Sequence, residues 1–64
     1  MKYREVLTMI HEDGWRIRSQ EGSHRQFTHP AKPGRVTVAG HPGHDVPKSM
    51  LASILRQAQI KPKR

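Results

Sequence analysis

The sequence has no cysteine, only three aromatic residues and no long hydrophobic run. Without cysteine, the chain can form neither disulfides nor thiolate zinc sites. No stretch approaches the roughly 20 apolar residues that a membrane-spanning helix needs. No charged-then-apolar leader opens the chain. We therefore expect a cytoplasmic protein that spans no membrane.

Acidic residues are also scarce. Twelve lysines and arginines stand against five acidic residues, which gives a formal net charge of +7 on 64 residues. The positive excess lies in the middle of the chain and after Lys48, whereas residues 1–14 are slightly acidic. A charge of this size indicates a polyanionic partner, with nucleic acid first and an acidic protein second.

Apolar spacing predicts one helix near each end of the chain. The first covers about residues 2–12, ends at Asp13-Gly14 and has an apolar stripe of Tyr3, Val6, Leu7 and Ile10. The second begins near Pro47 and runs through about Gln59, with an apolar stripe of Met50, Leu51, Ile54, Leu55 and Ala58. We expect residues 1–60 to form one domain and residues 61–64 to form a basic tail.

Three segments between these helices alternate in a way that predicts strands, over residues 15–19, 25–29 and 35–39. Pro30, Pro33 and Gly34 mark a turn between the second and third strands. Residues 40–47 hold two glycines and two prolines and predict a loop. The resulting fold class is α+β in the order α-β-β-β-α, a three-stranded antiparallel sheet with two helices on one face.

The register of the first two strands decides which residues face solvent. If one face is buried, it should carry Trp15, Ile17, Phe27, Val36 and Val38. Pairing Ile17 with Phe27 leaves Glu21-Gly22-Ser23 as a three-residue turn. A two-residue Gly22-Ser23 turn pairs Glu21 with His24 and separates Ile17 from Phe27, so burial disfavours it. The open face is then predicted to carry Arg16, Arg18, Gln20, His24, Gln26, Thr28, Arg35 and Thr37.

His24 is the candidate for chemistry, because an imidazole can take or give a proton near neutral pH. RNA suits a single basic group, since its 2′-hydroxyl is a built-in nucleophile. Arginines on the strands could bind or stabilise phosphates, and the predicted RNA-binding residues are Arg16, Arg18, Ser23, Arg25, Gln26 and Arg35. The alternatives are a surface histidine that helps a turn and a strand face that is merely solvated.

Five histidines raise the question of a metal site, and two of them are spaced closely in His41-Pro42-Gly43-His44. Zinc sites need three or four protein ligands in suitable geometry. Because these histidines are spread over helix, strands and loop, we expect no metal and no cofactor. His29 is expected at a strand end, partly covered, and His11 at a helix end.

The motif Gly22-Ser23-His24, followed by Phe27 and preceded by Gly14-Trp15, resembles the HicA family of bacterial toxins. The resemblance covers nearly the whole chain, including Val36-Thr37-Val38, His41-Pro42 and residues 53–58. It implies a double-stranded-RNA-binding-domain-like fold and a metal-independent endoribonuclease (mRNA interferase) of a type II toxin–antitoxin system. It also implies that His24 is catalytic, that mRNA is the substrate and that a HicB-type antitoxin is the inhibitor.

The chain departs from the usual family pattern at both ends of the second helix and just before it. Gly40 stands where proline is commoner, Ser49-Met50 where glycine-threonine is usual, and Gln59 where glycine is usual. These positions affect helix entry and exit rather than the histidine motif.

Two other functions remain open at this point: a non-catalytic small basic RNA-binding module, and a protein whose main ligand is an acidic partner.

Overall fold

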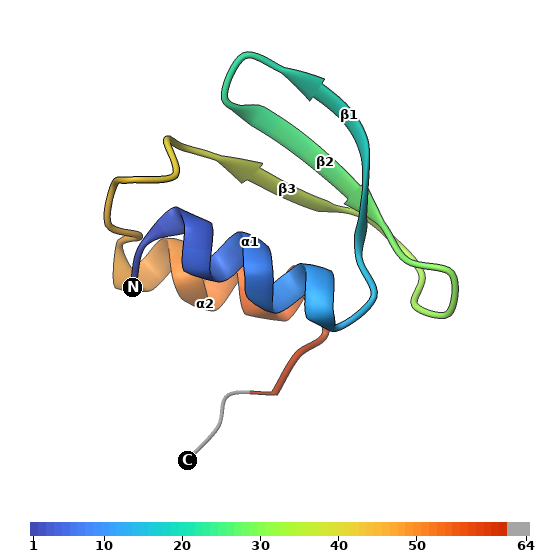
Figure 1. The fold of residues 1–64 in the computed structure, drawn as a ribbon. Helices are drawn as coiled ribbons and strands as arrows, with labels where there is room; N and C mark the ends of the chain where they lie inside the picture. The colour runs from blue at the N-terminus through green and yellow to red at the C-terminus, as the bar shows by residue number, and fades with distance from the viewer. Residues whose placement is uncertain (62–64) are drawn as a thin grey trace.

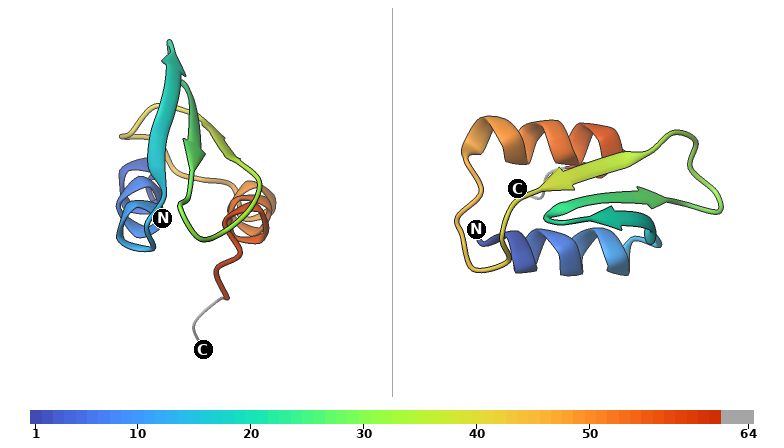
Figure 2. Two further views of the ribbon diagram at one scale, coloured as in Figure 1. Left: turned by 90° about the vertical axis from the view of Figure 1, so that its right-hand side faces the viewer. Right: turned by 90° about the horizontal axis from the view of Figure 1, so that it is seen from above.

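The computed structural model describes residues 1–61, and residues 62–64 of the predicted basic tail lie outside them. The elements run in the predicted α-β-β-β-α order: α1 (Tyr3–Glu12), β1 (Arg16–Glu21), β2 (His24–Thr28), β3 (Val36–Ala39) and α2 (Lys48–Ala58). The strands form one antiparallel sheet in the order β1-β2-β3. The two helices lie side by side on one face of the sheet and run in the same direction (Figures 1 and 2).

One small core lies between the helices and the sheet. It takes Tyr3, Val6 and Ile10 from α1, which confirms most of the first predicted stripe, and it contains Trp15, Phe27, Val36, Val38, Val46, Ile54 and Ala58 as well. The second stripe is only half confirmed. Leu51 and Leu55 are partly buried, whereas Met50 is 38% exposed and does not belong to the core. Among residues 1–61, no helix is long and apolar enough to cross a bilayer.

The prediction that Ile17 is buried is wrong. Ile17 lies opposite Phe27 as predicted, but it is 51% exposed whereas Phe27 is 6% exposed. The cause is that the β1–β2 hairpin extends beyond the helices (Figures 1 and 2), so every residue of β1 is exposed. Alternation in the sequence therefore identified the strand correctly, but α1 does not extend over it.

Because β1 contains a β-bulge, both alternative registers of β1 and β2 occur in the structure, each over a different part of the hairpin. Near the strand start, Ile17 pairs with Phe27, whereas at the tip Glu21 pairs with His24. The register shifts between Ile17 and Ser19, so one extra residue is absorbed there. The predicted three-residue turn is therefore wrong. Gly22-Ser23 forms a two-residue turn, and only its first residue has a positive φ, of 60°, as a type II′ hairpin requires.

The loop between β3 and α2 caps the start of α1. The amides of Tyr3 and Arg4 donate to the carbonyls of His44 and Pro42 at 3.0 and 3.1 Å. These bonds satisfy two of the helix donors that have no partner within the helix. Lys2 also pairs with Asp45 across an isolated β-bridge. This loop is consequently part of the fold and not a loose connection.

At the other end of the molecule, Lys32 joins the last turns of both helices. Its Nζ donates to Asp13 Oδ2 at 2.6 Å, and to the carbonyls of Ala58 and Gln59 at 3.2 and 3.0 Å. The indole of Trp15 donates to the same Ala58 carbonyl at 3.2 Å. The Lys32 ammonium holds the pKa of the Asp13 carboxyl below its ordinary value, chiefly through their hydrogen bond.

Candidate functional site

His24 begins β2 on the side of the sheet that faces away from the helices. It pairs with Glu21 on β1 and with Ala39 on β3. Its side chain is exposed, and within residues 1–61 it forms no hydrogen bond or ion pair. The imidazole therefore stands on a central strand with its two nitrogens available to a ligand, as the sequence predicted.

A shallow hollow of about 350 Å³ surrounds this histidine at the hairpin tip. Its lining residues come from the two paired strands and are Ser19, Gln20, Glu21, His24 and Gln26. Glu21 is a neighbour that the preferred sequence register missed, because that register placed it in the turn. The Gly-Ser pair between two strands was the available signal, since two-residue turns of this kind set the register of a hairpin.

One arginine reaches this group across the open face. Gln26 pairs with Thr37 on β3, and its Oε1 accepts a hydrogen bond from Arg35 Nη1 at 3.2 Å. Gln26 lies two residues after His24 on β2 and therefore shares its face, so Arg35 is held over that face as well. Arg18 is exposed and falls where the register shifts, between two paired residues. Ser23 sits in the turn directly before His24.

Two of the four arginines predicted to bind RNA lie away from His24. Arg16 turns back to α1, where its Nη1 donates to the His11 carbonyl at 2.8 Å. Arg25 pairs with Val38, so its side chain leaves on the helix side of the sheet, and its Nη1 donates to the Gly40 carbonyl at 3.3 Å. The placement of Arg16 on the open face was therefore wrong, and the reason is the attraction of helix-end carbonyls for a cation.

Gln20 also departs from its predicted face. The bulge makes it pair with Arg25 rather than with a residue of the open face. Its Nε2 donates to the Gly22 carbonyl at 3.3 Å, which ties it to the turn. The polar residues that the register does bring together around His24 are Ser19, Glu21, Gln26 and Thr37.

The remaining histidines are structural or lie apart from the sheet. His29 is 10% exposed, its Nε2 lies 2.7 Å from the Asp13 carbonyl, and its Nδ1 accepts from the amides of Ala31 and Lys32. Its ring also packs edge-on against Trp15. His41 and His44 pack edge-to-face in the loop, with ring centroids 5.1 Å apart. Within residues 1–61, no three His, Asp or Glu side chains gather into a metal-binding cluster.

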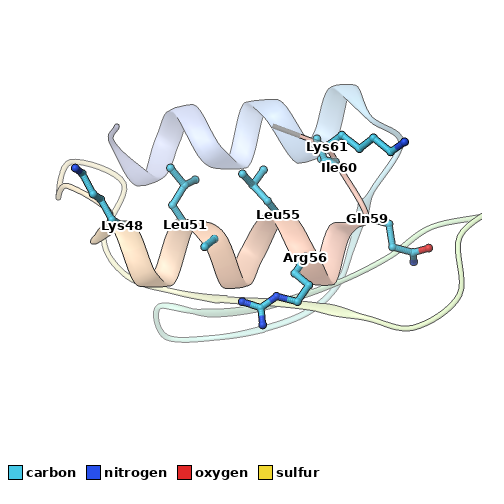
Figure 3. Close-up of a pocket in the computed structure, with 8 residues that line it drawn as sticks. Lys48, Leu51, Leu55, Arg56, Gln59, Ile60 and Lys61 are labelled. Atoms are coloured by element: carbon cyan, nitrogen blue, oxygen red, sulfur yellow. The ribbon is translucent and has the colours of Figure 1, made fainter. Parts of the chain in front are cut away.

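Two further concavities flank the helices. One lies between α1 and the β1–β2 hairpin. The other follows α2, where Leu51 and Leu55 point toward α1 between the cations Lys48 and Arg56 (Figure 3). Both have apolar floors and cationic rims, in contrast to the polar hollow at His24. On residues 1–61, the hollow at His24 is therefore polar, whereas these two grooves are apolar.

The family model for the HicA toxin of bacterial toxin–antitoxin systems matches residues 3–60. The chain belongs to the HicA toxin family. The match spans α1 through the end of α2, so it includes the whole sheet and His24. No curated protein matches the chain. Membership in the HicA family identifies this protein as a toxin of a toxin–antitoxin system, whose partner is an antitoxin.

The structure accounts for two departures from the usual HicA pattern. Gln59, where glycine is usual, ends α2 with a left-handed φ of 56°, a conformation that glycine adopts at little cost. Its side chain compensates in part, because Nε2 donates to the Pro33 carbonyl at 3.0 Å. A side chain at Gly40 would place its Cβ 2.5 Å from the ring of Tyr3, so that buried tyrosine requires glycine here.

Proposed function

We propose that this HicA-family toxin is a metal-independent endoribonuclease that cleaves mRNA in the cytoplasm, uses His24 as its acid/base and is neutralised by a HicB-type antitoxin. Residues 1–60 form its single toxin domain. The observation that carries the proposal is the position of His24: it is exposed, it lies on the central strand, and its side chain forms no hydrogen bond or ion pair within residues 1–61. A histidine kept for structure would resemble His29, whose ring is covered and hydrogen-bonded at both nitrogens.

The proposed reaction is transesterification within the RNA chain. A nitrogen of His24 takes the proton of a 2′-hydroxyl, the 2′-oxygen forms a bond to the adjacent phosphorus, and the bond from phosphorus to the 5′-oxygen breaks. A proton from water or from the imidazolium completes the leaving 5′-hydroxyl. The other product is a 2′,3′-cyclic phosphate. No metal is needed, because the nucleophile belongs to the substrate and positioned proton transfer supplies about 10²–10⁴-fold in rate.

The RNA would lie along the open face from the hairpin tip toward Arg35. Arg35 is held near His24 through Gln26 and can pair with a phosphate through its remaining N–H groups. Ser23 in the turn before His24 and Arg18 at the register shift of β1 complete the proposed contacts. Arg16 and Arg25 can add only general attraction for RNA, because their guanidinium groups are fixed on the helix side.

The test is induction of the wild type, His24→Ala and His44→Ala in parallel, followed by mapping of RNA ends. His44→Ala is the matched control, because it removes an exposed imidazole that lies in the loop rather than on the sheet. We expect growth arrest and new RNA ends from the wild type and the control, and neither from His24→Ala. Toxicity of His24→Ala equal to that of the wild type would refute the role of His24. RNA binding without cleavage by the wild type would support the non-catalytic RNA-binding module instead.

A further inference from the structure

The concavity between α1 and the β1–β2 hairpin has no role in the proposed cleavage. We call it the α1–β1 groove, and the residues that define it are Leu7, His11, Arg16, Ile17, Arg25 and Phe27. It opens on the helix side of the sheet, because Phe27 and Arg25 leave β2 on the face opposite to His24. A ligand in this groove and an RNA on His24 would therefore occupy different faces.

The floor of the groove is apolar surface that the fold leaves uncovered. Ile17 alternates with Trp15 in the manner of a core residue, yet half of its surface is exposed. Leu7 on α1 is only partly buried against the core. Removing the exposed half of an aliphatic side chain from water favours association in proportion to the apolar area covered. Ile17 and Leu7 thus offer a partner considerable stabilisation that the isolated chain does not use.

The rim of the groove is cationic and already oriented. Arg16 is anchored to the His11 carbonyl and Arg25 to the Gly40 carbonyl, each through Nη1. Arg16 Nη1 also lies 3.4 Å from His11 Nδ1 and donates to the Trp15 carbonyl at 3.1 Å. The Nε and Nη2 groups of both arginines form no hydrogen bond within residues 1–61. No acidic residue lines the groove. An occupant should consequently bring carboxylates to the rim and an apolar side chain to the floor.

We propose that the α1–β1 groove binds a segment of the antitoxin in which an apolar side chain, flanked by carboxylates, packs on Ile17. This inference rests on the antitoxin part of the proposed function. An acidic protein segment fits better than RNA, because a phosphate backbone has nothing to cover Leu7 and Ile17. The α2 groove of Figure 3 is less specific, because none of its lining cations is held by a hydrogen bond within residues 1–61.

Docking on this side makes neutralisation separable from cleavage. Ile17 is on the helix side of β1, whereas the hollow at His24 is on the other side near the hairpin tip. A change at Ile17 should therefore weaken the antitoxin complex and leave RNA cleavage intact. Ile17 is also suited to substitution, because its exposure makes the cost to folding small.

The experiment compares wild type, Ile17→Thr and Ile17→Asp with Leu55→Gln, which alters the α2 groove instead. The probe is the purified product of the reading frame next to the toxin gene, and calorimetry gives its Kd. We expect Ile17→Thr to raise the Kd about tenfold to hundredfold and Ile17→Asp to raise it further by repelling carboxylates. Leu55→Gln should bind within about twofold of wild type. RNA cleavage without antitoxin and thermal melting are measured for all four proteins.

The outcomes separate this inference from the proposed function. Unchanged binding by both Ile17 variants, or loss of binding in Leu55→Gln alone, overturns the groove assignment while the antitoxin proposal stands. Failure of the wild type to bind the neighbouring product refutes the antitoxin proposal itself. If Ile17→Thr weakens binding of a 2′-deoxy RNA analogue and leaves antitoxin binding unchanged, the groove belongs to RNA and the inference is wrong.

Discussion

Lys32 is expected to be the most important charged side chain for stability, and Lys32→Met tests this. The methionine keeps the length of the apolar stem and removes the ammonium, which pairs with Asp13 and bonds two carbonyls at the end of α2. An ion pair between partly exposed groups contributes about 0.5–1 kcal/mol, and a cation at a helix C-terminus about 0.3–1 kcal/mol. Loss of the hydrogen bonds to the Ala58 and Gln59 carbonyls adds about 1 kcal/mol.

The sum predicts that Lys32→Met lowers the free energy of unfolding by about 2 kcal/mol. In a domain of this size, that corresponds to a fall in Tm of about 8–16 °C. The assay is thermal unfolding at pH 7 followed by circular dichroism, with Lys48→Met as control. Lys48 is exposed and, within residues 1–61, forms no hydrogen bond or ion pair through its side chain, so the control should stay within about 0.5 kcal/mol. A Tm for Lys32→Met equal to that of the control would refute the reasoning.

Three other expectations concern the same ends of the helices. Gln59→Gly should raise the Tm slightly, because relief of a left-handed φ, worth about 1 kcal/mol, exceeds the loss of one exposed hydrogen bond. Gly14→Ala should lower stability by about 2 kcal/mol or more in denaturant titration, since φ is 112° and the new Cβ would lie 2.6 Å from His29 Nε2. The pKa of Asp13 is depressed on folding, so its contribution is full above about pH 4 and is lost as the pH falls through the folded value. Unfolding between pH 5 and pH 2 should therefore show a smaller pH dependence in Lys32→Met than in the wild type.

The order of the elements was predictable because it depends on local periodicity. Helical spacing of Tyr3, Val6 and Ile10 and alternation at Val36 and Val38 each identify an element without knowledge of its neighbours. Burial of Ile17 was not predictable, because it depends on how far α1 extends over the hairpin. The same limit applies to the contacts of Lys32, which join segments far apart in the chain.

The candidate site was predicted in part. His24 was placed correctly because its parity relative to Phe27 is set within one strand. Its neighbours on β1 depend on a bulge, and nothing in the alternation of residues 15–21 marks where the extra residue is absorbed. The cations were predicted from the strand pattern alone, but Arg16 follows the carbonyls at the end of α1 instead.

Cleavage of RNA by purified wild type and His24→Ala, at pH 7 with a metal chelator present, tests the central claim most directly. His44→Ala again serves as the matched control, and circular dichroism verifies that all three proteins are folded. We predict that the initial rate falls by about 10²–10⁴-fold in His24→Ala, while His44→Ala retains the rate of the wild type. A folded His24→Ala protein that cleaves RNA at a rate close to that of the wild type would contradict the account.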